Sequence, residues 1–167
     1  YINSRSWDFN VNEQGWRYHM SNIMAAIGIE QLKKLKKFFK IRQSIAKYYD
    51  QLLSKNNLVS VLNRDYNSVV PHIYVIRIKN LLNRDALKDV MLKNGIQIGI
   101  HYKPNHQLSY FQDEKVTDLP VTNMIFSEII SLPIHPDITD KDVEHVVSTL
   151  NNILPKSIQL KISSEKN

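Results

Sequence analysis

We predict an α/β chain in which a long helix leads into a small α+β domain. Two sequence patterns carry this prediction. Apolar side chains recur at helical spacing from about residue 21 to residue 54, and residues 71–78 alternate apolar and polar side chains as a half-buried strand does. Turn-forming residues divide the remainder, so the whole chain reads helix, strand, helix, strand, helix, strand, helix. Such a mixed order is typical of a small α+β unit.

The long helix changes character along its length. Ser21 suits the N-cap, because its hydroxyl can accept a hydrogen bond from a free amide of the first turn. Residues 23–29 are apolar on nearly every side, which indicates core or subunit interface, and a lysine-rich face follows them. The helix is longer than this small chain can easily bury. We therefore expect it to bridge to another domain or to a second subunit.

Short elements make up the rest of the chain. They are a strand over 71–78, a helix over 84–93 between an Asn83 cap and an Asn94-Gly95 end, a strand over 96–100, a loop over 101–119, a helix over 121–130, a strand over 132–134, and a helix from a Thr139 cap to Leu154, where Pro155 stops it. We predict four segments: an extended and looped stretch over 1–20, the helix over 21–56, the small domain over 57–155 and a flexible tail over 156–167.

The composition narrows the class of protein. Hydrophobic residues make up 43% and charged residues 23%, as in a soluble globular chain and unlike a disordered one. Cysteine is absent, which excludes disulfides and thiolate metal sites and fits a cytoplasmic protein. No apolar run approaches the ~18 residues of a membrane span, so we expect no membrane association. The chain opens on Tyr1 rather than methionine, and we expect an upstream segment.

Most familiar chemical signatures are missing. The sequence has no P-loop, no H-E-x-x-H and too few glycines for a dinucleotide-binding turn. His101 and His106 lie five residues apart in the predicted loop. They either share a ligand or serve separately as surface or capping histidines.

The net charge of +6 leaves two interpretations of the lysine-rich helix face open. Clustered cations can contact the phosphates of a nucleic acid. No aromatic side chains interleave with these lysines as a stacking platform, however, and no helix-turn-helix pair is present. A solvated helix face is the simpler interpretation, and we predict no nucleic-acid partner.

The segment before the long helix has the composition of an anion site. Gly15 permits a turn, Arg17 follows it, and the helix begins near Ser21. An arginine beside a helix N-terminus places a guanidinium and free amides around one anionic ligand. A phosphate group is a candidate for that ligand.

Residues 15–32, GWRYHMSNIMAAIGIEQL, resemble the G-x-x-Y-x-M-S/T-x-x-x-A-A-x-G-x-x-Q-L stretch of the DegT/DnrJ/StrS sugar aminotransferases. The similarity continues, in the same order, through five later stretches: residues 72–78, Gly95-Ile96, the HYKPNH of 101–106, Leu132-Pro133 and Asp142-Val143. The first stretch is specific to the family. Each later stretch is a weak match by itself, and their common order along the chain is what supports the similarity. Together the six stretches span nearly the whole chain.

The resemblance implies the C-terminal portion of a fold-type I transferase that uses pyridoxal phosphate. Residues 1–20 would end the large cofactor domain, and a long connecting helix would lead to a small three-stranded α+β domain. The family's cofactor-binding lysine and its aspartate partner lie in the N-terminal portion, and neither motif occurs here. The resemblance thus assigns no catalytic residue to this chain and implies that it is inactive alone.

The family's supporting residues can be carried over to this chain. Arg17 would contact the cofactor phosphate of the opposite subunit in a homodimer. Many members have asparagine there and arginine in place of His19, so this chain departs from the family at both positions. Substrate contacts would come from Tyr18 and His19 and from the loop residues His101, Tyr102 and His106.

The resemblance further implies transfer of an amino group from glutamate to a keto group of a nucleotide-linked sugar, in deoxyaminosugar or surface-polysaccharide synthesis. The alternative is a non-catalytic binding or regulatory module built on a basic helix.

Overall fold

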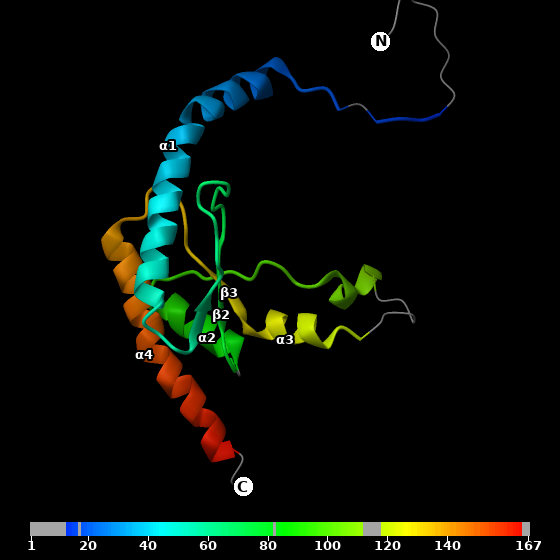
Figure 1. Cartoon of the computed structure of the whole chain (residues 1–167). Helices are drawn as coiled ribbons and strands as arrows, with labels where there is room; N and C mark the ends of the chain where they lie inside the picture. Colours follow the sequence, from blue (N-terminus) through cyan, green and yellow to red (C-terminus); the bar gives the residue numbers. More distant parts are fainter. Residues whose placement is uncertain (1–12, 17, 82, 112–117, 165–167) are drawn as a thin grey trace, which may run out of the picture. The chain divides into compact units, whose positions relative to one another are not determined.

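The computed structural model describes residues 13–16, 18–81, 83–111 and 118–164, with side chains through Leu154 (Figure 1). It divides into two compact units, residues 1–35 and 36–167, and each is described separately below. Residues 13–16 and 18–21 contain neither helix nor strand. The first part of the predicted 1–20 segment lies outside the described residues.

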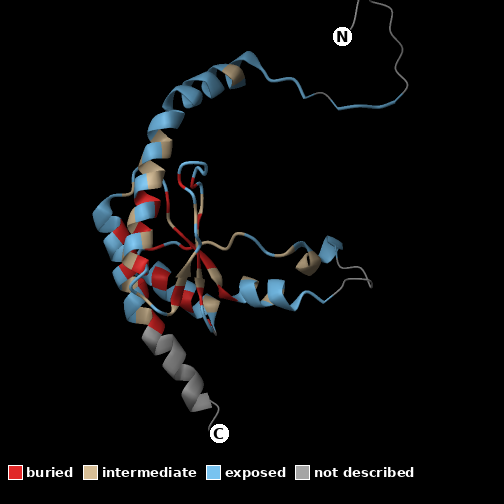
Figure 2. Cartoon of the chain, in the orientation of Figure 1, coloured by how far each residue is buried: buried red, intermediate tan, exposed pale blue. Residues whose placement is uncertain are grey.

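The predicted long helix is confirmed as α1, Asn22–Leu53. Ser21 caps it as expected, since the Met24 amide donates to the Ser21 hydroxyl oxygen at 3.3 Å. The apolar residues at its start are not a core of this chain: Ile23 is 75% exposed and Ile27 52% (Figure 2). Their alternative role in a subunit interface stays a prediction.

A three-stranded antiparallel sheet of order β1-β2-β3 forms the centre of the second unit. Its strands are β1 Val59–Val61, β2 Tyr74–Ile78 and β3 Ile129–Leu132. β2 lies within the predicted strand 71–78, and Tyr74, Ile76 and Ile78 turn one face into the core.

One observed strand was not predicted, and one predicted strand is not a strand in the structure. β1 was not predicted, because three residues beside asparagine-rich turns are too short for a pattern to emerge. Residues 96–100 make only a single bridge, Gly99 to Ser131, although Ile96 and Ile98 are buried. The alternation of apolar and polar residues over 96–100 therefore reflects the burial of Ile96 and Ile98, and not the hydrogen-bond pairing of a strand.

The helix predicted over 84–93 is confirmed at both ends. α2, Arg84–Lys93, is capped by Asn83, whose side-chain oxygen accepts from the Ala86 amide at 2.9 Å. It ends at Lys93, followed by the C-cap Asn94 and by Gly95, whose φ of +77° favours glycine. The loop after residue 100 contains two short 3₁₀ helices, η1 Asn105–Gln107 and η2 Ser109–Phe111.

The last two helices correct the prediction at their C-terminal ends. α3, Pro120–Glu128, has proline at its first turn and stops before Ile129, where β3 begins three residues earlier than expected. α4, Asp140–Ser164, runs through Pro155 instead of ending at Leu154. Proline removes one helical hydrogen bond and can kink a helix without terminating it. None of the described helices is both long and apolar enough to cross a membrane.

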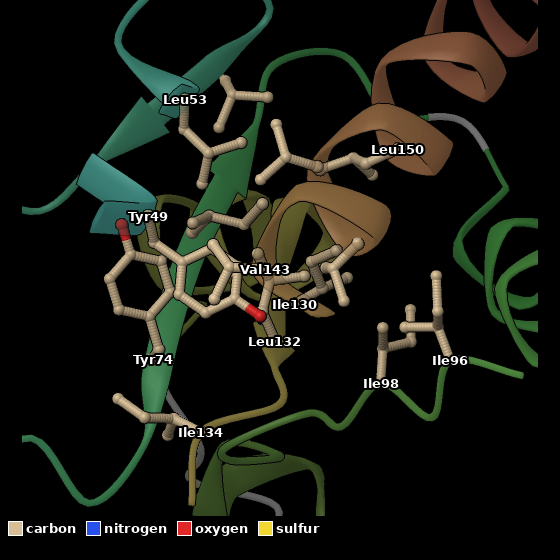
Figure 3. Close-up of a cluster of buried hydrophobic side chains, with 14 of the residues drawn as sticks. Tyr49, Leu53, Tyr74, Ile96, Ile98, Ile130, Leu132, Ile134, Val143 and Leu150 are labelled. Atoms are coloured by element: carbon tan, nitrogen blue, oxygen red, sulfur yellow. The ribbon is translucent and has the colours of Figure 1, made fainter. Parts of the chain in front are cut away.

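The core of the second unit joins the C-terminal half of α1, the sheet, α2 and α4. Tyr49 of α1 stacks on Tyr74 of β2, with ring centroids 4.8 Å apart (Figure 3). Val143 and Leu150 of α4 are fully buried in the same cluster. The α/β class, with a small α+β domain, is therefore confirmed.

Asp50 of α1 adds a polar link to this core. The hydroxyls of Tyr66 and Tyr74 each donate to one of its carboxylate oxygens at 2.5 Å. Burial, assisted by the hydrogen bond to Asp50, raises the pKa of Tyr66 to about 12. The same two causes raise the pKa of Tyr74. The guanidinium of Arg64 lies 4.8 Å from the Tyr74 ring centroid, in a cation–π contact.

Candidate functional site

His101 is held against β3 by the bridge that precedes it. Gly99 and Ser131 exchange both backbone hydrogen bonds, at 2.9 and 2.8 Å. His101 follows Gly99 by two residues, and the Nδ1 atom of its imidazole lies 2.8 Å from the Ser131 hydroxyl oxygen. A Cβ on residue 99 would stand only 2.8 Å from the ring's Cε1 atom. Glycine at position 99 therefore makes room for the imidazole.

A cavity of about 790 Å³ opens beside this histidine, entirely within the second unit. It lies between β3 and the chain after it, the 95–99 segment and the first turns of α4. Its walls combine apolar side chains with polar ones that can orient a ligand, as in many small-molecule sites. The titratable side chains that line it are His72, His101, His135, His145, Asp142 and Tyr49.

Several of these polar groups are already engaged with the protein. Asp142 accepts hydrogen bonds from the hydroxyl and amide of Thr139, at 2.6 and 2.8 Å, and they lower its pKa. It thus remains an acceptor at neutral pH. His145 donates from Nε2 to the Asn94 carbonyl at 3.1 Å, and Tyr49 donates to the Pro133 carbonyl at 3.1 Å. Among the described residues, the His101 imidazole by contrast makes a hydrogen bond at Nδ1 alone.

The described residues contain no cluster of three or more His, Cys, Asp or Glu side chains arranged to hold a metal ion. No lysine lines the cavity either, so its described walls do not fit a covalently held pyridoxal phosphate, which requires an amine.

The structure separates the loop residues that the sequence singles out. Tyr102 is 69% exposed and meets the His101 ring edge-on, with centroids 4.8 Å apart. His106 turns instead to α3, where its Nε2 lies 2.8 Å from the Asn123 side-chain oxygen. His101 lines the cavity, whereas Tyr102 and His106 are not among its lining residues. The substrate roles of all three remain predictions.

The earlier site residues belong to the first unit or lie outside the description. Tyr18 is 87% exposed and His19 is exposed. Arg17, the predicted contact for the cofactor phosphate, lies outside the described residues.

Sequence reasoning missed most of the cavity. Ser131 stands 30 residues from His101, and His72, His135 and His145 come from three further segments. None of them carries a local motif. Only the antiparallel pairing of the strands could have brought Ser131 to the Gly99 bridge, and the sequence contained no signal for that register.

Comparison with known proteins agrees with this architecture. Residues 3–151 match the DegT/DnrJ/EryC1/StrS aminotransferase family. The chain belongs to this family. Over 160 residues, or 93% of the chain, it is 31% identical to the UDP-4-amino-4,6-dideoxy-N-acetyl-beta-L-altrosamine transaminase of Campylobacter jejuni, of which it spans 42%.

Solved structures show the same fold. The aminotransferase TlmJ of Streptoalloteichus hindustanus is 28% identical, with a TM-score of 0.72 over 86% of this chain and 39% of its own. PseC of Helicobacter pylori, an aminotransferase involved in the biosynthesis of pseudoaminic acid, is 22% identical, with a TM-score of 0.76 over 95% of this chain and 43% of its own. The latter likeness bears on fold alone. The predicted fold, a portion of a fold-type I transferase, is confirmed by this family's structures.

Proposed function

We propose that this chain is the C-terminal part of a pyridoxal-phosphate-dependent aminotransferase that moves an amino group from glutamate to a keto group of a nucleotide-linked sugar. Two findings support the proposal: the family match over residues 3–151, and the similarity to a transaminase named for a UDP-linked amino sugar. In the intact enzyme, bound pyridoxal phosphate supplies the electron sink for the reaction.

The structural observation behind this proposal is that His101 lines a cavity of the small domain whose other polar side chains include Ser131 and Asp142. Sugars and their pyrophosphates present many acceptor oxygens, and a fixed imidazole can donate to one of them. We assign substrate contacts to His101, Tyr102 and His106, and further contacts to Tyr18 and His19. A net charge of +6 favours the approach of a dianionic nucleotide sugar.

The cofactor contact and the homodimer belong to the same proposal. Arg17 would donate to the cofactor phosphate of the opposite subunit, as the family resemblance implies. The exposed apolar start of α1, with Ile23 75% and Leu32 69% exposed, offers a surface for the second subunit to cover. The chain lacks the family's cofactor-binding lysine motif, so we propose that it orients ligands and is inactive by itself.

A test uses the full-length enzyme and two half-reactions followed by cofactor absorbance. One half-reaction starts from glutamate. The other starts from UDP-4-amino-4,6-dideoxy-N-acetyl-beta-L-altrosamine as the amino-sugar probe, whose amino group would pass to 2-oxoglutarate over a full cycle. His101→Ala is expected to lower kcat/KM for the amino sugar at least about tenfold and to change the glutamate half-reaction less than about twofold.

Asn152→Ala, at an exposed position of α4, is the matched control and should behave as the unmodified enzyme. Full-length protein that turns over neither amino donor, yet binds DNA in a salt-dependent way, would support the binding-module alternative instead.

A further inference from the structure

We infer that Ser131 is a positioning residue that holds His101 as the Nε2–H tautomer, so that His101 presents a hydrogen-bond donor to an oxygen of the sugar substrate. This inference rests on the proposed function for the identity of the ligand. The contact itself is a property of the described small domain.

The backbone of Ser131 is held on both sides. It pairs with Val75 of β2 on one side and bridges Gly99 on the other. The residue is 4% exposed, so its hydroxyl has little access to bulk solvent. A residue locked in this way can hold a neighbouring side chain in a defined place.

The direction of the hydrogen bond follows from the donors and acceptors available. A buried hydroxyl proton needs an acceptor, because leaving it unpaired is costly. Within the described residues, the hydrogen-bond partner of the Ser131 hydroxyl is Nδ1 of His101, at 2.8 Å. If Ser131 donates to Nδ1, that nitrogen carries no proton, and the proton of the neutral imidazole resides on Nε2.

The Gly99 contact confines the ring from a second direction. A Cβ at residue 99 would lie 2.8 Å from Cε1, 3.4 Å from Nδ1 and 3.7 Å from Nε2. The imidazole therefore packs against the bare backbone of Gly99 while Nδ1 faces Ser131. Because His101 also lines the cavity, the Nε2–H group remains for a ligand there.

These contacts assign His101 the role of donor rather than of proton acceptor. The neutral Nε2–H group would bind a carbonyl, hydroxyl or phosphoryl oxygen of the nucleotide sugar. Such a bond is made in the ground state, so its loss should raise KM more than it lowers kcat.

Two variants disturb His101 by different physical means. Ser131→Ala removes the hydroxyl and leaves the strand backbone unchanged. Gly99→Ala keeps the hydroxyl but places a Cβ 2.8 Å from the ring's Cε1 atom, so the ring must leave its present position. Ser127→Ala is the matched control, since the Ser127 hydroxyl donates to the Met124 carbonyl within α3 and contacts no histidine in the described structure.

The first measurement needs no ligand. In full-length protein labelled with ¹⁵N-histidine, imidazole nitrogen shifts distinguish protonated from unprotonated Nδ1. We expect unprotonated Nδ1 and protonated Nε2 for His101 in the unmodified and Ser127→Ala proteins. Both Ser131→Ala and Gly99→Ala should allow the Nδ1–H form to appear. Protonated Nδ1 in the unmodified protein, or no change in either variant, would overturn the inference.

The second measurement follows KM for the same amino-sugar probe. Ser131→Ala should raise KM about three- to tenfold, as expected for one lost hydrogen bond, with kcat within about twofold. Unchanged KM in Ser131→Ala, while His101→Ala impairs use of the sugar, would refute the positioning role and leave the proposed function intact. Unchanged KM in His101→Ala would instead contradict the proposed substrate role, and the inference with it, whatever the tautomer.

Discussion

The two ends of α1 carry similar apolar side chains and bury them to opposite extents. Near its C-terminal end, Ile45, Tyr49 and Leu53 are at most 5% exposed in the core of the second unit. Near its N-terminal end, Ile23, Ile27 and Ile29 are 75%, 52% and 55% exposed in this chain. Apolar helical periodicity thus indicates that a face should be buried but does not say which molecule buries it.

The largest expected effect belongs to the buried end. Leu53→Ala should lower the free energy of unfolding of the 167-residue chain by about 2–5 kcal/mol, because it removes buried methyl groups and leaves a cavity. Leu53 is fully buried. Urea titration monitored by circular dichroism measures the change.

Leu32→Ala makes the same substitution where the side chain is 69% exposed. It should change the unfolding free energy by less than about 0.5 kcal/mol. Equal losses in the two variants would mean that both ends of α1 are buried within this chain, and the comparison would fail.

The exposed end should matter for assembly instead. Ile27→Asp is expected to raise the dimer dissociation constant of the full-length protein at least about tenfold, because a carboxylate would have to be desolvated in the interface. In the 167-residue chain alone it should cost less than about 1 kcal/mol. Sedimentation over a range of concentrations measures the first effect and urea titration the second.

Lys34→Asp is a matched control, since it introduces the same side chain at an exposed lysine of the same helix. It should leave the dimer nearly as stable as before. Equal dissociation in both variants, or none in Ile27→Asp, would remove the apolar start of α1 from the proposed interface.

Elements with local signals were predictable from the sequence. The Ser21 and Asn83 caps are confirmed at the starts of α1 and α2, because a cap is a contact between residues three apart. The end of α2 just before Gly95 was also predictable from local sequence. A positive φ favours glycine, and this preference does not depend on distant parts of the chain.

Elements without such signals were misplaced. Ile129 and Ile130 were assigned to a helix although they begin β3, since a short apolar run fits a buried helix or a buried strand equally well. Residues 96–100 alternate like a strand and make one bridge only. In both places, pairing with a distant segment decides the outcome, and one sequence does not reveal that pairing.

The candidate site likewise contains one residue that the sequence indicated and others that only the structure revealed. His101 was singled out through the family resemblance and lies at the cavity, whereas Ser131 and Gly99, which hold its ring, were not proposed as site residues. Their roles depend on a bridge between segments about thirty residues apart. Tertiary contacts of this kind become visible only in the folded chain.

The smallest expected effect tests the polar anchor of the buried end of α1. Burial and the bond to Asp50 raise the pKa of Tyr66 from 10.0 to about 12. The folded chain therefore keeps this proton at a pH where the unfolded chain releases it. The resulting stability is complete below about pH 10 and is lost as the pH rises through 12. Tyr66→Phe should reduce this alkaline loss and lower stability at pH 8 by about 1 kcal/mol, the usual contribution of one hydrogen bond.

Urea titrations between pH 8 and pH 11.5 measure both changes, with Tyr110→Phe as a control at a side chain that is 91% exposed. All other side chains are identical in the three proteins, so the difference between variants isolates the phenol. If Tyr66→Phe and Tyr110→Phe show the same alkaline loss as the unmodified chain, the Tyr66–Asp50 bond does not anchor α1. The burial of Ile45, Tyr49 and Leu53 would then be sufficient to distinguish the two ends of the helix.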